Sequence, residues 1–285
     1  MNDLPAVFYA ADDASSAAQQ RYVQLVRTQT GLLILAALLS VAAAGWERPL
    51  IGVAAIVVLA VVALLEIVPA KAVADGAWYL GRAVAESAKT LGWRYAVGGA
   101  PFFVVSTEES AERLLAERLD DVVSLGGRGW LLRAEDEAIA TSWMISCRGS
   151  SLEQRRAVYR KRRIEDQIRW YESKATENAR SSKVWTIVPA SISVAGIALA
   201  LFVRSDGPWI AAIALASVGT CAAMAWAMLR SYRQQAEAYR LTAEELQSIR
   251  QSVDSVVEEE AWAIFVAGAE HAISREHTMW SATRP

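Results

Sequence analysis

The chain has 285 residues, of which 54% are hydrophobic, and its formal net charge is only -2. This charge argues against a protein that binds polyanions over its whole surface, although it leaves room for a local basic patch. The two cysteines, Cys147 and Cys221, are too few for a disulfide framework or a cysteine-rich metal cluster.

Four apolar segments lack Asp, Glu, Lys and Arg and are about 17 to 23 residues long, close to the roughly 20 residues that a helix needs to cross a bilayer. They are Thr28–Trp46, Pro49–Leu65, Val184–Val203 and Gly207–Leu229. Each is apolar on all faces, which is typical of lipid-facing helices; a soluble bundle of wholly buried helices is the alternative. The sequence therefore predicts an all-α membrane protein with four transmembrane helices and a helical cytoplasmic domain.

Short connections predict that the spans form two antiparallel hairpins, joined through Trp46-Glu47-Arg48-Pro49 and through Arg204-Ser205-Asp206. Basic residues near the span ends lie mainly on one side: Arg21, Arg27, Lys71, Arg82, Arg180, Lys183, Arg230 and Arg233, against Arg48 and Arg204 on the other. The positive-inside rule then places both termini and the central segment in the cytoplasm.

The expected organisation has five parts. They are a cytoplasmic N-terminal segment (1–27), a first hairpin (28–69), a cytoplasmic helical domain (70–183), a second hairpin (184–229) and cytoplasmic C-terminal helices (230–285). The first residues lack the basic and apolar regions of a signal peptide, so the first span is expected to stay as an anchor.

The central domain begins with helix-forming residues over Ala72–Leu91, which Gly98-Gly99-Ala100-Pro101 interrupts. A second helix is expected over Ala111–Leu125, after a helix-start signal. Gly126-Gly127-Arg128-Gly129 predicts a turn, since it lacks the Lys-Ser/Thr ending of a phosphate-binding loop. Trp143-Met144-Ile145-Ser146-Cys147 predicts a short strand.

From Leu152 the pattern predicts one long helix that continues into the third span, with the basic run Arg160-Lys161-Arg162-Arg163 near its start. A solvated helix with a positive-inside flank explains this run. A site for anionic lipid headgroups or for a phosphate-bearing ligand is the functional alternative.

Heptad spacing after the fourth span predicts a helix that packs on the central domain or on another subunit, through Tyr232, Tyr239, Leu246 and Val253. Ala261–Trp280 predicts a further amphipathic helix. No metal is expected there, because His271 and His277 lack companion ligands.

The spans contain no charged relay or metal set, and the nearest ionisable residue is Glu66 at the cytoplasmic edge. This argues against a proton-coupled transporter and against an intramembrane enzyme. Small and hydroxyl-bearing residues recur at helical spacing, which predicts close helix packing or a pore wall. The pore-lining candidates are Ser40, Thr186, Ser193, Gly196, Ser217 and Thr220.

Three aromatic-rich stretches resemble the SLATT family, the SMODS- and SLOG-associating two-transmembrane effectors. The first is Trp78-Tyr79-x-Gly81-Arg82-Ala83-x-Ala85-Glu86-Ser87-x-Lys89-Thr90-x-x-Trp93-Arg94-Tyr95, with Gly98-Gly99-x-Pro101-Phe102 after it. The others are Arg163-Ile164-Glu165-Asp166-Gln167-x-x-Trp170-Tyr171-x-x-Lys174-Ala175 and Ser274-Arg275-Glu276-His277-x-x-Trp280. With two hairpins, the match resembles a tandem arrangement, one SLATT unit around each hairpin.

The resemblance implies a bacterial inner-membrane effector of anti-phage defence that forms pores and harms the cell's own membrane when infection is sensed. It also implies a nucleotide or oligonucleotide signal from a partner nucleotidyltransferase, which either opens the pore or holds it shut. A homo-oligomer in membrane lipid is expected, with a tetramer as the guess, because four helices barely enclose an aqueous path. Neither an enzymatic activity nor a cofactor is expected.

The polar residues of the matching motifs are the candidates for ligand binding or gating: Arg82, Glu86, Lys89, Arg94, Tyr95, Arg163, Asp166 and Gln167. For each, an internal ion pair or hydrogen bond that builds the fold is the structural alternative. The competing function is a non-conducting membrane scaffold that recruits a cytoplasmic partner.

Overall fold

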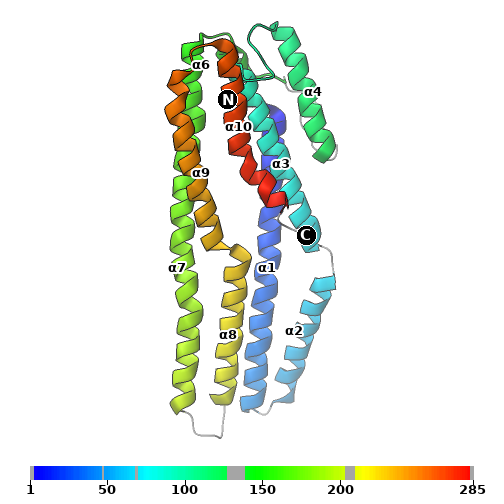
Figure 1. The fold of residues 1–285 in the computed structure, drawn as a ribbon. Coiled ribbons are helices and arrows are strands. Elements are labelled where there is room, and N and C mark those ends of the chain that lie inside the picture. The colour runs from blue at the N-terminus through cyan, green and yellow to red at the C-terminus, as the bar shows by residue number, and fades with distance from the viewer. Residues whose placement is uncertain (1–2, 47, 68–69, 127–138, 203–208, 283–285) are drawn as a thin grey trace. The chain divides into compact units, whose positions relative to one another are not determined.

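A computed structural model describes residues 3–46, 48–67, 70–126, 139–202 and 209–282 (Figure 1). Within these ranges the regular secondary structure is helical, as the all-α prediction requires. Four described helices are long and apolar enough to cross a membrane, and each overlaps one of the four predicted spans. The connections at Glu47 and at Arg204-Ser205-Asp206 lie outside the described residues, as do Gly127, Arg128 and Gly129 of the expected turn.

The two hairpins use helices that extend beyond the spans. In the first hairpin, α1 (Ala6–Trp46) is followed by α2 (Pro49–Ile67). In the second, α7 (Glu165–Phe202) is followed by α8 (Trp209–Arg230). The remaining helices are α3 (Ala70–Val97), α4 (Glu108–Gly126), α5 (Ser142–Arg148), α6 (Leu152–Tyr159), α9 (Tyr232–Ser252) and α10 (Glu259–Ala282).

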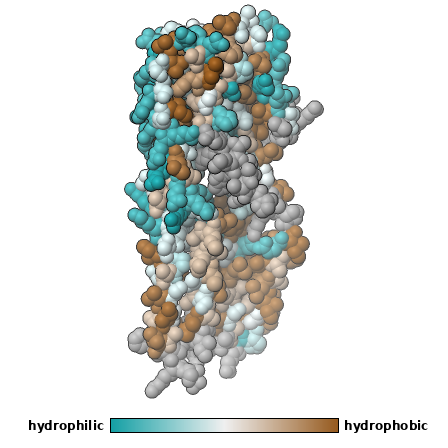
Figure 2. Space-filling view, in the orientation of Figure 1, coloured by the Kyte–Doolittle hydropathy of each residue, from teal (hydrophilic) through white to brown (hydrophobic). Residues whose placement is uncertain are grey.

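The chain divides into two compact units. The first combines Met1–Gln19, Ala74–Ser173 and Tyr239–Pro285, and the second combines Gln20–Val73 and Lys174–Ala238. Brown hydrophobic residues gather along the membrane-length helices of the second unit, and teal hydrophilic residues cover much of the visible face of the first (Figure 2). This distribution follows from composition, because the second unit holds the four uncharged spans.

Aromatic side chains from distant parts of the sequence form the core of the first unit. The ring of Tyr159 lies edge-on to Trp262 and to Trp93, with centroids 5.7 and 6.0 Å apart. Tyr95 makes a similar contact with Phe102 at 5.8 Å. Such edge-to-face pairs stabilise a core beyond the area that they bury. Helices that precede the second hairpin in the sequence and helices that follow it therefore share one core.

A tight glycine turn ends α3, as the Gly98-Gly99-Ala100-Pro101 signal predicts. Gly98 has a φ of +74°, and an added Cβ would lie 2.5 Å from Val104 Cγ2 and 2.7 Å from Arg155 Nη1. A Cβ on Gly99 would meet Val266 at 2.5 Å. Glycine is needed at the first position for its backbone conformation and at both for space.

The strand predicted over Trp143–Cys147 is wrong, because these residues belong to α5. Thr141 caps this helix, and its side chain accepts a hydrogen bond from the Met144 backbone nitrogen at 3.2 Å. A short apolar run has no clear periodicity, so the cap decides the structure. The expected long helix from Leu152 is confirmed, although it contains a π-helical turn at Arg160–Ile164.

In the second unit, small residues bring α7 and α8 close together. A Cβ added to Gly196 would lie 3.0 Å from the Ala216 Cβ, and the hydroxyls of Ser193 and Thr220 are 3.2 Å apart. Small residues at such a crossing let two backbones approach closely. The second hairpin is therefore built on a tightly packed seam.

Candidate functional site

Five charged residues of the first unit are buried among those that the structure describes, Glu86 on α3 being one of them. We call the other four the buried polar core: Arg148, Arg155, Arg163 and Glu270. Their residues are 6%, 1%, 1% and 0% exposed. Burying a charge is costly unless it is paired or hydrogen-bonded, so each must have partners. They come from α5, α6, the π-helical turn and α10.

Arg163 and Glu270 form a bidentate ion pair at the centre of the buried polar core. Arg163 donates from Nε to Oε1 at 2.9 Å and from Nη2 to Oε2 at 2.7 Å. Glu270 also accepts from the Tyr159 hydroxyl at 2.9 Å and from the Thr90 hydroxyl at 3.0 Å. One carboxylate thus connects α3, α6, the π-helical turn and α10. The turn adds a residue to the helical repeat and so changes the direction in which Arg163 points.

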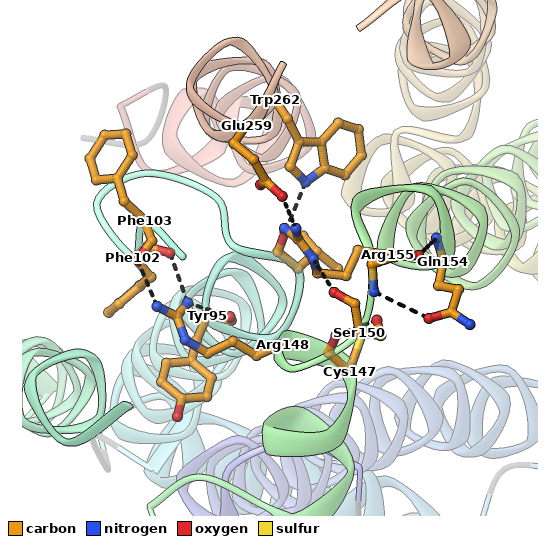
Figure 3. Close-up of polar contacts among 12 residues, drawn as sticks. Tyr95, Phe102, Phe103, Cys147, Arg148, Ser150, Gln154, Arg155, Glu259 and Trp262 are labelled. Atoms are coloured by element: carbon orange, nitrogen blue, oxygen red, sulfur yellow. Dashed lines mark hydrogen bonds and ion pairs between the residues drawn. The ribbon is translucent and has the colours of Figure 1, made fainter. Parts of the chain in front are cut away.

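Arg148 is held by backbone carbonyls near the glycine turn (Figure 3). Its Nη1 donates to Phe102 O at 2.8 Å and to Tyr95 O at 3.3 Å, and its Nη2 donates to Phe103 O at 2.7 Å. The guanidinium also lies 5.2 Å from the centroid of the Tyr95 ring. The charge is therefore solvated by carbonyl dipoles and by a ring face.

Arg155 connects the end of α3 to α10 (Figure 3). Its Nη1 donates to Val97 O at 3.0 Å, and its Nη2 pairs with Glu259 Oε1 at 2.5 Å. The Trp262 indole nitrogen donates to the same Val97 oxygen at 2.8 Å. The position of α10 is thus fixed by polar contacts at Glu259 and Trp262 and again at Glu270.

Burial and neighbouring charges shift the pKa values of this region so that Tyr159 and Cys147 stay neutral and Arg163 stays charged. Burial raises the pKa of Tyr159 well above its usual value, and the negative charge of Glu270 raises it further. Burial is the largest influence on Arg163 and lowers its pKa, but the charge and hydrogen bonds of Glu270, together with the charges of Tyr159 and Glu86, raise the pKa by more in sum. Burial also raises the pKa of Cys147, which disfavours a reactive thiolate.

Three of the sequence-predicted residues lie together on α3. Arg82 pairs with Glu86 at 2.9 Å and with Asp12 at 3.5 Å, and Lys89 lies 3.9 Å from Glu86. Burial lowers the pKa of Lys89, partly offset by Glu86. Arg94 lies further along the helix, where its Nε donates to Ala100 O at 2.6 Å and braces the glycine turn.

The other candidates are dispersed. Tyr95 is fully buried against Arg148, and Arg163 belongs to the buried polar core. Asp166 pairs with Arg169 at the exposed surface, and Gln167 is half-buried on α7. All these contacts are within the fold, as the structural alternative expects, and a ligand-binding role stays a prediction.

The pore-lining candidates divide into two groups. Ser193, Gly196 and Thr220 lie in the seam between α7 and α8. The hydroxyls of Ser40, Thr186 and Ser217 instead donate to carbonyls four residues earlier in their own helices. Such back-bonding satisfies a hydroxyl in a membrane helix without an aqueous partner. Pore lining stays a prediction for both groups.

Sequence reasoning missed Glu270, Arg148 and Arg155. Glu270 lies in a helix with several other acidic residues, and Arg155 lies in a basic stretch that predicts a solvated face. One signal was available: Glu270 is flanked by small and apolar residues over Ala261–Ile273, where a carboxylate on the buried face needs a cation.

The buried polar core links helices that are distant from one another in the sequence. Among the described residues, no group of three or more His, Cys, Asp or Glu side chains could hold a metal ion. Within the buried polar core Arg163 pairs with Glu270, whereas Arg155 pairs with Glu259 and Arg148 bonds to backbone carbonyls. Such a core couples several helices, because moving one of them breaks buried polar contacts.

Comparison with known families gives two matches along the chain. Residues 5–156 match the model described as SMODS and SLOG-associating 2TM effector domain 3, and residues 159–280 match effector domain 1 of the same name. No curated protein and no solved structure matches the chain. The two matches meet beside the π-helical turn, and each contains one hairpin. The chain therefore belongs to the SLATT family and carries two SLATT domains in tandem.

Proposed function

We propose that this protein is a membrane effector of bacterial anti-phage defence that forms an oligomeric, ion-conducting pore. A nucleotide or oligonucleotide made by a partner nucleotidyltransferase gates the pore, either by opening it or by holding it shut. The observation that carries the proposal is the tandem match to 2TM effector domains, together with four helices of membrane-spanning length.

The bias of Lys and Arg supports an inner-membrane location with both termini and the first unit in the cytoplasm. There the first unit is exposed to soluble signals. The proposal places several subunits around an axis, because the described part of one chain supplies four membrane-length helices and four helices barely enclose an aqueous path. A tetramer is the assembly that we propose.

Helix α7 supplies a mechanical route from signal to pore. Its residues up to Ser173 belong to the first unit, and those from Lys174 onward belong to the second. It begins directly after the π-helical turn that carries Arg163. A ligand that rearranges the buried polar core would therefore shift a helix that continues into the membrane. Pro189, inside α7, is a point where such a helix bends.

The decisive test is ion flux through liposomes that contain the purified protein, with and without added nucleotides or short oligonucleotides. Flux that one of these compounds switches on or off supports a gated pore and identifies the class of signal. Protein that is folded and oligomeric yet silent under every condition contradicts the proposal.

Arg94 offers a sharper test of the ligand site. Arg94→Ala should change toxicity in cells while expression and membrane insertion stay normal. Arg113→Ala is the matched control, because the pair that Arg113 forms with Glu109 lies at the exposed surface. An unfolded Arg94→Ala product would contradict the ligand role and leave bracing of the glycine turn as the function of Arg94.

The competing function is a non-conducting scaffold that recruits a cytoplasmic partner. The closely packed seam of the second hairpin favours it, because Ser193 and Thr220 bond to each other. A scaffold with an altered seam would lose assembly, whereas a pore would change its flux.

A further inference from the structure

We propose that the second hairpin carries a binding site for the phosphate headgroup of an anionic phospholipid, built by Trp185, Trp226, Arg230 and Tyr232. We call these four residues the aromatic cluster. They lie at the end of the hairpin remote from the connection between α7 and α8. Trp185 is next to the first residue of one predicted span, and Arg230 follows the last residue of the other. This is the level at which a helix pair passes from hydrocarbon to headgroups.

Arg230 is held in place by two aromatic rings. Its Cζ lies 5.9 Å from the Trp226 centroid and 5.5 Å from the Tyr232 centroid, and its Nε donates to the Tyr232 hydroxyl at 3.3 Å. Among the described residues, the Tyr232 hydroxyl is the hydrogen-bond acceptor found for the Arg230 side chain. Its terminal nitrogens remain available as a fork, the geometry that suits two oxygens of one phosphate.

A second donor lies beside the arginine. The Trp226 indole nitrogen is buried and has no hydrogen-bond partner among the described residues, and its ring lies 6.0 Å from that of Trp185. A buried N–H group without an acceptor is destabilising, so a group that supplies one is favoured.

The backbone contributes to the same site. Ser231 has a φ of +45°, which interrupts the helix between α8 and α9 and brings the Tyr232 ring back onto Arg230. Arg230, Trp226 and Tyr232 thus lie together at one end of the hairpin. This arrangement suits the phosphate of an anionic phospholipid such as phosphatidylglycerol.

The experiment measures thermal unfolding of the full-length protein in a mild detergent while one additive is titrated: phosphatidylglycerol, phosphatidylcholine or inorganic phosphate. We expect phosphatidylglycerol alone to raise the midpoint, by roughly 5 °C at saturation. An equal rise with inorganic phosphate would point to a soluble phosphate-bearing ligand and overturn the lipid assignment. No rise with any additive would overturn the site itself.

Arg230→Gln should abolish the rise, and Arg230→Lys should reduce it, because a lysine keeps the charge but not the fork. Arg233→Gln is the matched control. It removes the same charge three residues away, where the side chain is 84% exposed and pairs with Glu237. Trp226→Phe, which keeps a ring but removes the N–H, should also weaken the response. Equal losses in the Arg230 and Arg233 variants would show diffuse attraction and no site. This readout does not depend on ion flux, so its outcome is independent of the proposed pore.

Discussion

Arg163 and Glu270 form a bidentate ion pair with side chains 1% and 0% exposed, although 107 residues separate them in the sequence. Each lies in a different part of the chain, and the whole second hairpin lies between them. The pair therefore fixes α10 against the π-helical turn that precedes α7. Because the pair is buried, removing either partner would leave an uncompensated charge in the core of the first unit.

Removing the charge of Glu270 should be strongly destabilising. Glu270→Gln leaves Arg163 buried without a counter-charge, which costs about 3–5 kcal/mol. Unfolding of the purified protein in detergent measures the loss. Glu244→Gln is the control, since Glu244 forms an exposed pair with Arg240 and should change stability by less than about 1 kcal/mol. Similar effects of the two changes would contradict a structural role for the buried pair.

Two glycine-to-alanine substitutions should change the stability of the protein in opposite directions. Gly99→Ala places a methyl group 2.5 Å from Val266 Cγ1 and 2.9 Å from its Cβ, so overpacking should cost about 1–3 kcal/mol. Gly268→Ala meets nothing within 4 Å in α10 and should stabilise the helix by up to about 1 kcal/mol. Unfolding midpoints of both variants test the close approach of the glycine turn to α10. An unchanged unfolding midpoint for Gly99→Ala would show that Gly99 and Val266 have room between them for a methyl group.

The raised pKa of Tyr159 predicts a loss of stability at alkaline pH. Below about pH 10 the phenol is neutral in both folded and unfolded protein. Above it, the unfolded chain releases this proton first, so stability falls as pH rises towards the higher folded pKa, by up to about 1.4 kcal/mol per pH unit. The unfolding midpoint of Tyr159→Phe should lack this component. Its difference from wild type should stay constant between pH 7 and 9 and shrink above pH 10; a constant difference throughout would contradict the prediction.

Widening the seam of the second hairpin should change ion flux. Gly196→Val adds atoms where a Cβ alone lies 3.0 Å from Ala216 Cβ. Overpacking of the seam costs about 1–3 kcal/mol, and each 1.4 kcal/mol changes a closed–open equilibrium about tenfold. Ala198→Val, on an exposed face of the same helix, is the control and should behave like wild type. If the Gly196 variant forms intact oligomers but its ion flux is unchanged, the packing of α7 on α8 does not control the opening of the pore.

The membrane helices could be predicted from the sequence because their signal is local. An uncharged run such as Pro49–Leu65 needs no knowledge of its neighbours to indicate a span. The heptad positions Leu246 and Val253, 1% and 0% exposed, were likewise predicted correctly as a packing stripe. The glycine turn at Gly98 also carries its own local reason, since a positive φ and close neighbours both require glycine.

The buried polar core could not be predicted, because its partners are distant in sequence and each looks ordinary in its own segment. Arg163 lies in a basic run that is typical of a solvated flank. A π-helical turn, which has no simple sequence signature, decides which of these arginines is buried. Arg148 is harder still, because its partners are the backbone carbonyls of Tyr95, Phe102 and Phe103. No complementary charge marks such a site.

The contribution of α10 to the first unit has a consequence for biosynthesis. Trp262 and Glu270 leave the ribosome only after both hairpins have been translated, yet their contacts reach back to Val97, Tyr159 and Arg163. The membrane helices can therefore insert while the core that precedes them still lacks its last helix. A nascent chain that stops after the second hairpin has all four membrane segments but leaves the arginine of the central ion pair without its carboxylate.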